Sequence, residues 1–220
     1  MAHGNLFRLH RLIEIKKERM LDLNLRLFQY MAAGFTPNPV LLTLASFIAV
    51  NGSWLSVGLL GWAAWRYPTQ RGYLLATLIA CGLATTLAHN IAASFNWPRP
   101  FVLGVSPTYV EHGARGGLPS SHATVMFTLA LAFLTRRPLW RLGSLMAVSA
   151  ALVSWARVYV GIHFPMDIGA GILLACGIVG VLHAAIGLGC RYLSWPVGLK
   201  AGIDKAATRL TSQVHALWRR

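Results

Sequence analysis

The sequence predicts an all-α protein, a polytopic membrane helical bundle of about five to six helices that include an amphipathic helix near the N-terminus. Hydrophobic residues make up 55% of the 220-residue chain and charged residues only 12%, about half the charged fraction of a soluble domain. Four long stretches are nearly free of charge, as expected of segments that cross a bilayer. No polar linker divides these stretches, so we expect a single membrane domain.

Three regions are expected along the chain: an amphipathic basic segment over residues 1–38, a membrane core over 39–190, and a basic cytoplasmic tail over 191–220. Within the first region, Leu, Ile and Phe alternate with Arg, Lys and Glu at helical spacing over residues 6–36. This pattern predicts an amphipathic helix that lies along the membrane surface. The prolines that follow it are expected to end the helix.

Five spanning helices are expected in the core, at about 40–65, 73–95, 121–135, 139–156 and 165–190. The third is short, because a crossing of about 30 Å needs about twenty residues at roughly 1.5 Å each. A site sunk slightly below the membrane surface would account for the short helix.

Charge in the loops predicts which end of the bundle faces the cytoplasm. The short loops at 66–71 and 136–141 hold five arginines, and short basic loops tend to stay on the cytoplasmic side. The loop 96–118 and the junction 157–164 then share the external face. Five spans would also place the basic N-terminal segment outside, against the same tendency, so the side of that segment is left open.

The formal net charge of +14 is not read as a sign of nucleic-acid binding. Most basic residues lie in the two tails and in short loops, where attraction to anionic lipid headgroups is the ordinary explanation. The acidic residues number six, and only two of them lie between the first and last apolar stretches. A metal centre built from carboxylates needs several oxygen ligands close together, so no metal and no other cofactor is expected.

Pro119-Ser120-Ser121-His122 stands where a polar segment meets an apolar run. Pro119 and Ser120 are typical of a helix start, with Ser120 as the N-cap. Free N–H groups at Ser121 and His122, at the positive end of the helix dipole, would form an anion site. The alternative is a capped helix whose histidine simply faces water.

The stretch from Arg157 to Asp167 is more specific. Pro165 suits the first position of a helix, which places Asp167 in the first turn and His163 just ahead of it. A carboxylate there can fix the tautomer of the imidazole and leave its other nitrogen free to attack. Arg157 would lie near the end of the preceding helix, where its planar fork suits phosphate oxygens. The alternative is a structural His–Asp pair beside an arginine that extends to the membrane surface.

Arg99 lies between Pro98 and Pro100, at the end of the second expected span. The two prolines make a stiff corner that aims the guanidinium. Together with the other two stretches, Arg99 completes a set of two histidines, two arginines, one carboxylate and a pair of serines. Such a set suits transfer of a phosphoryl group through a histidine nucleophile, and its apolar surroundings point to a lipid substrate.

These three stretches resemble, in order and spacing, the motifs of the type 2 phosphatidic acid phosphatase superfamily of integral-membrane lipid phosphatases. The matching residues are Arg99-Pro100, then Pro119-Ser120-x-His122, and then Arg157 followed by His163 and Asp167. The resemblance covers roughly residues 40–190, and the last motif is the specific one. Within the superfamily, the residues around the motifs look most like those of the bacterial undecaprenyl pyrophosphate phosphatases.

The resemblance implies a role for each matched residue and a reaction that needs no metal. The implied catalytic residues are His163 as the nucleophile that forms a phosphohistidine, Asp167 as the group that orients it, and His122 as the proton donor to the leaving oxygen. The implied phosphate-binding residues are Arg99, Arg157 and Ser120, with Ser121 beside them in the same helix start.

The chain departs from the family pattern at Ala92, seven residues before Arg99, where the superfamily has lysine. One expected phosphate-binding cation is therefore missing. His89, Asn90 or Arg115 could provide the contact, and the sequence does not choose among them. Ser121 also stands where glycine is common, which the first turn of a helix tolerates.

The resemblance implies hydrolysis of undecaprenyl pyrophosphate to undecaprenyl phosphate and phosphate, at the periplasmic face of the bacterial inner membrane, for recycling of the carrier lipid used in cell-envelope synthesis. Alternatives with the same chemistry are a phosphatase or phosphotransferase acting on phosphatidylglycerophosphate, phosphatidic acid or lipid A. A non-enzymatic alternative is a transporter or scaffold that binds lipid headgroups through basic loops. Membrane lipids and a lipid phosphate are the expected partners, and the oligomeric state is left open.

Overall fold

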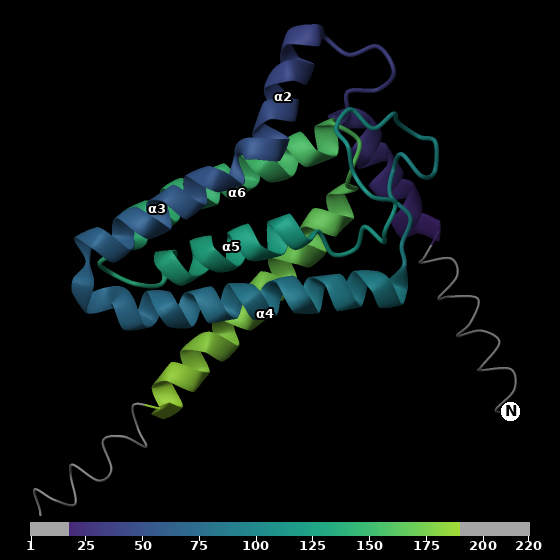
Figure 1. The fold of residues 1–220 in the computed structure, drawn as a ribbon. Coiled ribbons are helices and arrows are strands. Elements are labelled where there is room, and N and C mark those ends of the chain that lie inside the picture. Colours follow the sequence, from purple (N-terminus) through teal and green to yellow (C-terminus); the bar gives the residue numbers. More distant parts are fainter. Residues whose placement is uncertain (1–17, 190–220) are drawn as a thin grey trace, which may run out of the picture. The chain divides into compact units, whose positions relative to one another are not determined.

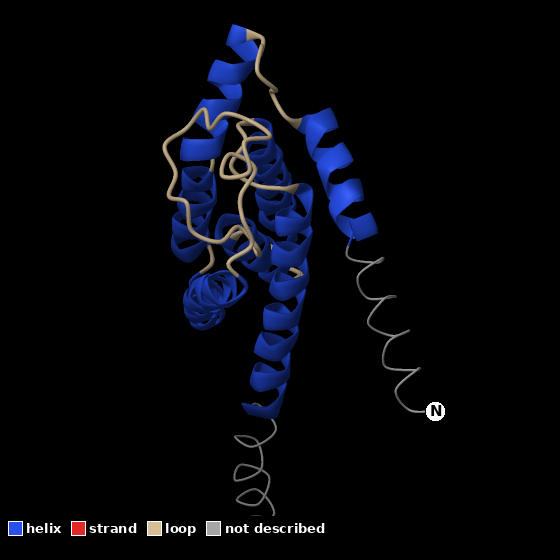
Figure 2. Cartoon of the chain, turned by 90° about the vertical axis from the view of Figure 1, so that its right-hand side faces the viewer, coloured by secondary structure: helices blue, strands red, loops and turns tan. Residues whose placement is uncertain are grey.

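The computed structural model describes residues 18–189, which form only helices and loops (Figure 1, Figure 2). The predicted all-helical architecture is therefore confirmed over this range. The start of the predicted amphipathic helix, the last residue of the fifth predicted span and the basic tail fall outside the described residues.

The described part of the predicted amphipathic segment is a helix over residues 18–31. Its Phe28 side chain is fully buried, and the Phe28 ring packs edge-on against Phe164, with 5.1 Å between ring centroids. Asn24 is 2% exposed, and its Oδ1 accepts a hydrogen bond of 3.1 Å from the Met166 main-chain N–H. One face of this helix therefore packs against the segment that carries His163.

The predicted single helix over 40–65 is instead two helices, α2 (Pro39–Asn51) and α3 (Ser53–Arg66), which meet at a bend of 43°. The expectation of one continuous helix is wrong because of Gly52, which lies between Asn51 and Ser53. Glycine and serine are weak helix formers and commonly mark a kink. Gly52 also lies so close to Val153 of a neighbouring helix that a Cβ would clash with that side chain.

The remaining described helices are the short 3₁₀ turn η1 (Pro68–Gln70), α4 (Arg71–Phe95), α5 (Ser121–Leu134), α6 (Trp140–Tyr159) and a final helix, Pro165–Gly189. The helix α5 lies between α4 and α6 and packs against both (Figure 1). Its buried side chains include Ala123, Ala130 and Ala132. Small residues such as these let helix backbones approach closely within a membrane.

Three of the described helices are long and apolar enough to cross a bilayer: Pro68–Phe95, Trp140–Tyr159 and Pro165–Gly189. The bent pair α2 and α3 can supply a fourth span. Helix α5 has 14 residues, which corresponds to about 21 Å of helix. The sequence predicted five spans, of which this one was expected to be short, and in the structure α5 is short.

The two short arginine-rich loops lie at the same end of the bundle, as predicted. Arg136 Nε donates a hydrogen bond of 3.1 Å to Gln70 Oε1, and the Arg136 guanidinium lies 4.6 Å from the centre of the Tyr73 ring. At the other end, the Gly117 N–H donates to the Trp97 carbonyl over 2.8 Å. The polar loop 96–118 therefore folds back over the end of the bundle that carries the motif residues.

Candidate active site

The second and third motifs are joined by a main-chain hydrogen bond. The Ser120 N–H donates to the Asp167 carbonyl over 2.9 Å, so the start of α5 lies against the first turn of the final helix. Ser120 has the extended backbone of an N-cap residue, and its Oγ accepts from the Ala123 N–H at 3.5 Å, which confirms the predicted cap. A Cβ added to Gly171 would lie 3.0 Å from the Ser120 carbonyl oxygen, so glycine there allows the close approach.

His163 and Asp167 form a buried pair, with side chains 3% and 1% exposed. His163 Nδ1 lies 3.1 Å from Asp167 Oδ2, and the same oxygen accepts the Phe164 N–H at 2.9 Å. The final helix begins at Pro165, as predicted, which brings the two side chains onto the same face. Because an ionised carboxylate only accepts hydrogen bonds, we assign the imidazole proton to Nδ1 and the lone pair to Nε2.

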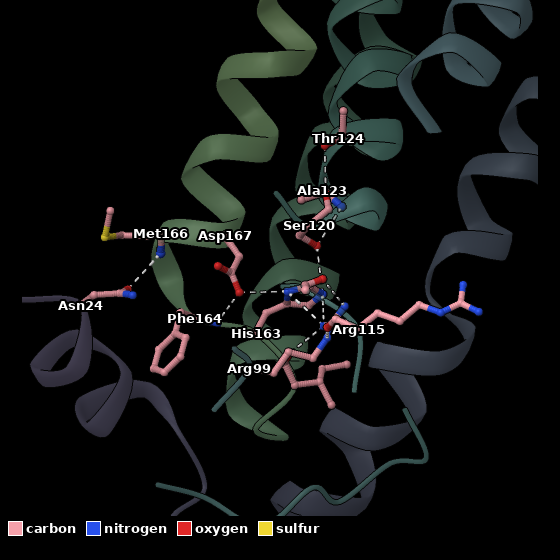
Figure 3. A network of polar contacts seen from close by, with 12 residues as sticks. Asn24, Arg99, Arg115, Ser120, Ala123, Thr124, His163, Phe164, Met166 and Asp167 are labelled. Carbon is pink, nitrogen blue, oxygen red and sulfur yellow. Dashed lines mark hydrogen bonds and ion pairs between the residues drawn. The ribbon is translucent and has the colours of Figure 1, made fainter. Parts of the chain in front are cut away.

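Two donors converge on the free nitrogen of His163, as Figure 3 shows. Nη1 of Arg99 lies 3.1 Å from Nε2, and Ser120 Oγ lies 3.3 Å from the same atom. Nη1 also lies 3.4 Å from Nδ1, but Nδ1 is already engaged by Asp167, so the Arg99 contact belongs to Nε2. A group bound at Nε2 would find both donors within reach.

Arg99 is held in place by main-chain carbonyl groups. Its Nε donates to Arg115 over 2.8 Å, its Nη1 to Ile162 over 2.8 Å, and its Nη2 to Gly116 over 3.3 Å. These carbonyls come from the loop 96–118 and from the junction beside His163. The guanidinium therefore has a fixed position and orientation before any ligand binds.

The positive charge nearby affects the acid–base behaviour of the junction. Burial first, and then the charges of Arg99 and Arg157, hold the pKa of His163 well below the 6.5 of an ordinary histidine. The imidazole is therefore neutral at neutral pH, which is the form that can act as a nucleophile.

Arg157 lies in the last turn of α6 and is 4% exposed. Its Nη1 donates to the Ala49 carbonyl of α2 over 3.0 Å, while its buried Nε has no hydrogen-bond partner among the described residues. The charge of Arg157 also acts on His163 and His122. Arg157 therefore has an unused N–H donor and lies near His163 and His122, so it is available to bind an anion. Its contact with the phosphate of a substrate stays a prediction.

Ser121 and His122 occupy the first turn of α5 and are partly exposed. The His122 ring makes no hydrogen bond within residues 18–189, and it lies within electrostatic reach of His163 and Arg99. The structure therefore brings the two predicted catalytic histidines into one neighbourhood, with His122 on the side of the helix start.

None of the three suggested substitutes for the missing lysine brings its side chain to His163. The His89 Nδ1 contacts the Thr85 carbonyl at 2.8 Å on an exposed face of α4. The Asn90 side chain is exposed on the same helix. Arg115 offers its carbonyl to Arg99, but its exposed side chain points away from His163 in Figure 3. At Ala92, where the family has lysine, the main-chain carbonyl lies so close to Gly116 that a Cβ added to Gly116 would clash with it.

His112 is a residue of this neighbourhood that sequence reasoning missed. Its ring centroid lies 6.1 Å from that of His163, with 63° between the ring planes. Burial, followed by the charges of Arg99 and Arg157, lowers the pKa of His112 to about 4. The only cue in the sequence is its place in the polar loop between the first two motifs, which by itself does not distinguish it from any loop histidine.

The chain is similar to known proteins in sequence and in fold. The sequence model of the PAP2 superfamily matches residues 69–188. The chain is 36% identical over 167 residues to the Escherichia coli K12 protein named "Putative undecaprenyl-diphosphatase YbjG", covering 75% of this chain and 82% of that protein. It is 32% identical over 114 residues to a protein named lipid A 4'-phosphatase from Bacteroides thetaiotaomicron, covering 46% of this chain and 49% of that protein.

A solved structure shares the fold. The crystal structure of Aquifex aeolicus LpxE superposes with a TM-score of 0.61 at 23% sequence identity, and the match covers 74% of this chain and 95% of that one. This chain therefore shares its arrangement of helices with that protein.

Proposed function

Since this chain belongs to the PAP2 superfamily, we propose that it is a membrane phosphatase that hydrolyses undecaprenyl pyrophosphate to undecaprenyl phosphate and inorganic phosphate. The observation that carries the proposal is the arrangement around His163: Nδ1 engaged by Asp167, and Nε2 facing Arg99 and Ser120. The choice of lipid rests on the similarity to the protein named an undecaprenyl-diphosphatase.

In the first step, Nε2 of His163 attacks the terminal phosphorus of the lipid diphosphate. A bond forms between nitrogen and phosphorus, and the bond from phosphorus to the bridging oxygen breaks. His122 donates a proton to that oxygen as undecaprenyl phosphate leaves. Arg99, Ser120 and the N–H groups at the start of α5 bind the oxygens of the transferred group, where negative charge accumulates.

In the second step, a water molecule attacks the phosphohistidine. His122, now neutral, accepts a proton from the water, and the bond between nitrogen and phosphorus breaks to release inorganic phosphate. Asp167 stabilises the positive charge that the His163 ring carries while it is bonded to phosphorus. The cycle returns both histidines to their starting protonation states.

The proposed reaction uses no metal ion. A divalent cation in other phosphatases neutralises the phosphate and the leaving oxygen. Here, the guanidinium groups of Arg99 and Arg157 supply positive charge, and His122 supplies the proton. Chelation is therefore expected to leave phosphate release unchanged.

We propose that the site faces the periplasm, because the arginine-rich loops lie at the opposite end of the bundle and such loops favour the cytoplasm. Hydrolysis there regenerates the monophosphate form of the carrier lipid for envelope synthesis. Lipid A is the second candidate substrate, since one relative is named a lipid A 4'-phosphatase. A scaffold that only binds headgroups would not need a histidine fixed between a carboxylate and two donors.

The deciding experiment measures phosphate release by the purified protein in detergent with EDTA present. The substrates are undecaprenyl pyrophosphate, lipid A, phosphatidylglycerophosphate and phosphatidic acid. The highest kcat/KM is expected for undecaprenyl pyrophosphate, and a higher value for another lipid overturns the substrate assignment. His163→Ala should be inactive, while His89→Ala, on the exposed face of α4, is the matched control. Absence of phosphate release from every lipid would overturn the enzymatic function.

A further inference from the structure

The loop segment that carries His112 is anchored on both sides. Before it, the Tyr109 N–H donates to the Val160 carbonyl over 3.2 Å, and the Tyr109 hydroxyl donates to the Gly34 carbonyl over 2.6 Å. After it, the carbonyls of Arg115 and Gly116 accept from Arg99. The main chain between these points therefore has little freedom, and the position of His112 near His163 is a consequence of the fold.

The His112 ring is half-buried and has no hydrogen-bond partner among the residues that the structure describes. The ring centroids of His112 and His163 are 6.1 Å apart, and no hydrogen bond joins the two rings. Both rings can, however, contact a single ligand. An imidazole without a protein partner, beside two buried guanidinium groups, favours an anionic ligand.

The distances suggest which part of the substrate His112 would contact. The atoms nearest to Nε2 are already Arg99 Nη1 at 3.1 Å and Ser120 Oγ at 3.3 Å, and these suit the phosphoryl group that is transferred. His112 makes no hydrogen bond to Nε2, and its ring centroid lies 6.1 Å from that of His163. A lipid diphosphate places its second phosphate one step farther from Nε2 than the first, and this second phosphate has no partner yet assigned.

We propose that His112 binds the second phosphate of a diphosphate substrate, the one that leaves with the lipid, and so favours diphosphates over monophosphates. This inference rests on the proposed function and adds a determinant of its specificity. The imidazole donates a hydrogen bond to an oxygen of that phosphate, and no covalent bond is made or broken by His112. The negative charge of the ligand opposes the effects of burial and of the two arginine charges, which otherwise keep the ring neutral.

The test compares wild type with His112→Ala and His112→Gln, using undecaprenyl pyrophosphate and the soluble monophosphate para-nitrophenyl phosphate. Loss of a hydrogen bond to a charged group lowers affinity by about one to two powers of ten. His112→Ala should therefore lower kcat/KM for the diphosphate about tenfold to a hundredfold and change the value for the aryl phosphate less than about threefold. His112→Gln, which keeps a donor, should recover part of the loss. His89→Ala should match wild type.

A second measurement does not depend on the lipid. Inorganic pyrophosphate and inorganic phosphate are compared as competitive inhibitors of aryl phosphate hydrolysis. Wild type should bind pyrophosphate at least tenfold more tightly than phosphate, and His112→Ala should lose that preference. If wild type hydrolyses the aryl phosphate but not undecaprenyl pyrophosphate, the proposed substrate fails, while the inhibitor comparison still decides the role of His112.

Two results would overturn the role of His112. One is an unchanged preference for pyrophosphate and unchanged kcat/KM in His112→Ala. The other is an equal loss of activity on the diphosphate and on the aryl phosphate, because that pattern means that His112 acts on the transferred phosphoryl group or on the fold.

Discussion

Replacing Asp167 with asparagine tests how the pair with His163 contributes to the proposed reaction. The carboxylate is 1% exposed, and its Oδ2 accepts both the His163 Nδ1–H and the Phe164 N–H. Asparagine has nearly the same shape, so packing is preserved. The substitution removes the negative charge and allows an amide N–H to face Nδ1, which favours the wrong tautomer of the imidazole.

The expected loss follows from these contacts. A hydrogen bond to a charged group contributes about 1.5–3 kcal/mol, and this one grows in value as the His163 ring becomes positive in the transition state. A loss of about 2.7 kcal/mol corresponds to roughly a hundredfold in rate. The same substitution in a serine protease triad lowers kcat by about 10⁴, so we expect a fall in kcat between about 10² and 10⁴.

The assay is phosphate release from the lipid substrate, with kcat and KM determined separately. The value of KM should change little, because Asp167 contacts His163 and the main chain and no predicted substrate atom. Asp22→Asn is the control, since the Asp22 carboxylate is exposed and forms an ion pair with Arg26. A kcat of Asp167→Asn within threefold of wild type would refute the reasoning and assign Asp167 a purely structural role.

Four further predictions concern the nucleophile, its pH dependence, its support and the topology. His163→Ala should abolish turnover. Wild-type protein quenched during turnover should retain labelled phosphate when the quench is alkaline and lose it when the quench is acid. An adduct that is stable in acid argues against phosphohistidine. Because the pKa of His163 lies well below 6.5 and the neutral ring is the reactive form, kcat/KM should rise with pH with a midpoint below pH 6.5, and it should fall again at higher pH as His122 loses the proton that it donates. A midpoint of the rising limb above pH 6.5 contradicts the assignment. Asn24→Ala should leave the Met166 N–H without its partner and cost about 1–3 kcal/mol of stability, measured as a lower melting temperature in detergent. The substitution should also lower kcat more than it raises KM. Wild-type values would mean that the contact contributes nothing. Gly113→Cys, at an exposed position with open space around it, should react with an impermeant thiol reagent on intact cells when the native cysteines are removed; reaction only after lysis would place the site in the cytoplasm.

Local features of the site could be predicted from the sequence because neighbouring residues determine them. Serine before an apolar run indicated the cap at Ser120, and proline at position 165 indicated the start of the final helix. The spacing of His163 and Asp167 across that start then placed both side chains together. In each case, the geometry depends on a few residues within one turn of helix.

Contacts between distant segments could not be predicted in the same way. The bend at Gly52 depends on how closely Val153 of another helix approaches. The contact of Asn24 with Met166 joins residues 142 positions apart, and an asparagine in an amphipathic helix carries no sign of its partner. His112 likewise comes close to His163 only because other residues of its loop are anchored, so its position is a product of tertiary structure.

The three carbonyl contacts of Arg99 limit what this side chain can give to a substrate. A guanidinium has five N–H groups, and three of them are directed at the carbonyls of Arg115, Ile162 and Gly116. Two remain, and one of these faces His163 until a phosphate arrives. Lysine at this position would have three N–H groups on one ammonium in place of the planar fork, too few to contact the three carbonyls and a ligand together. Because the loop contacts do not involve the ligand, departure of phosphate leaves the loop attached, and the site is ready for the next substrate without refolding.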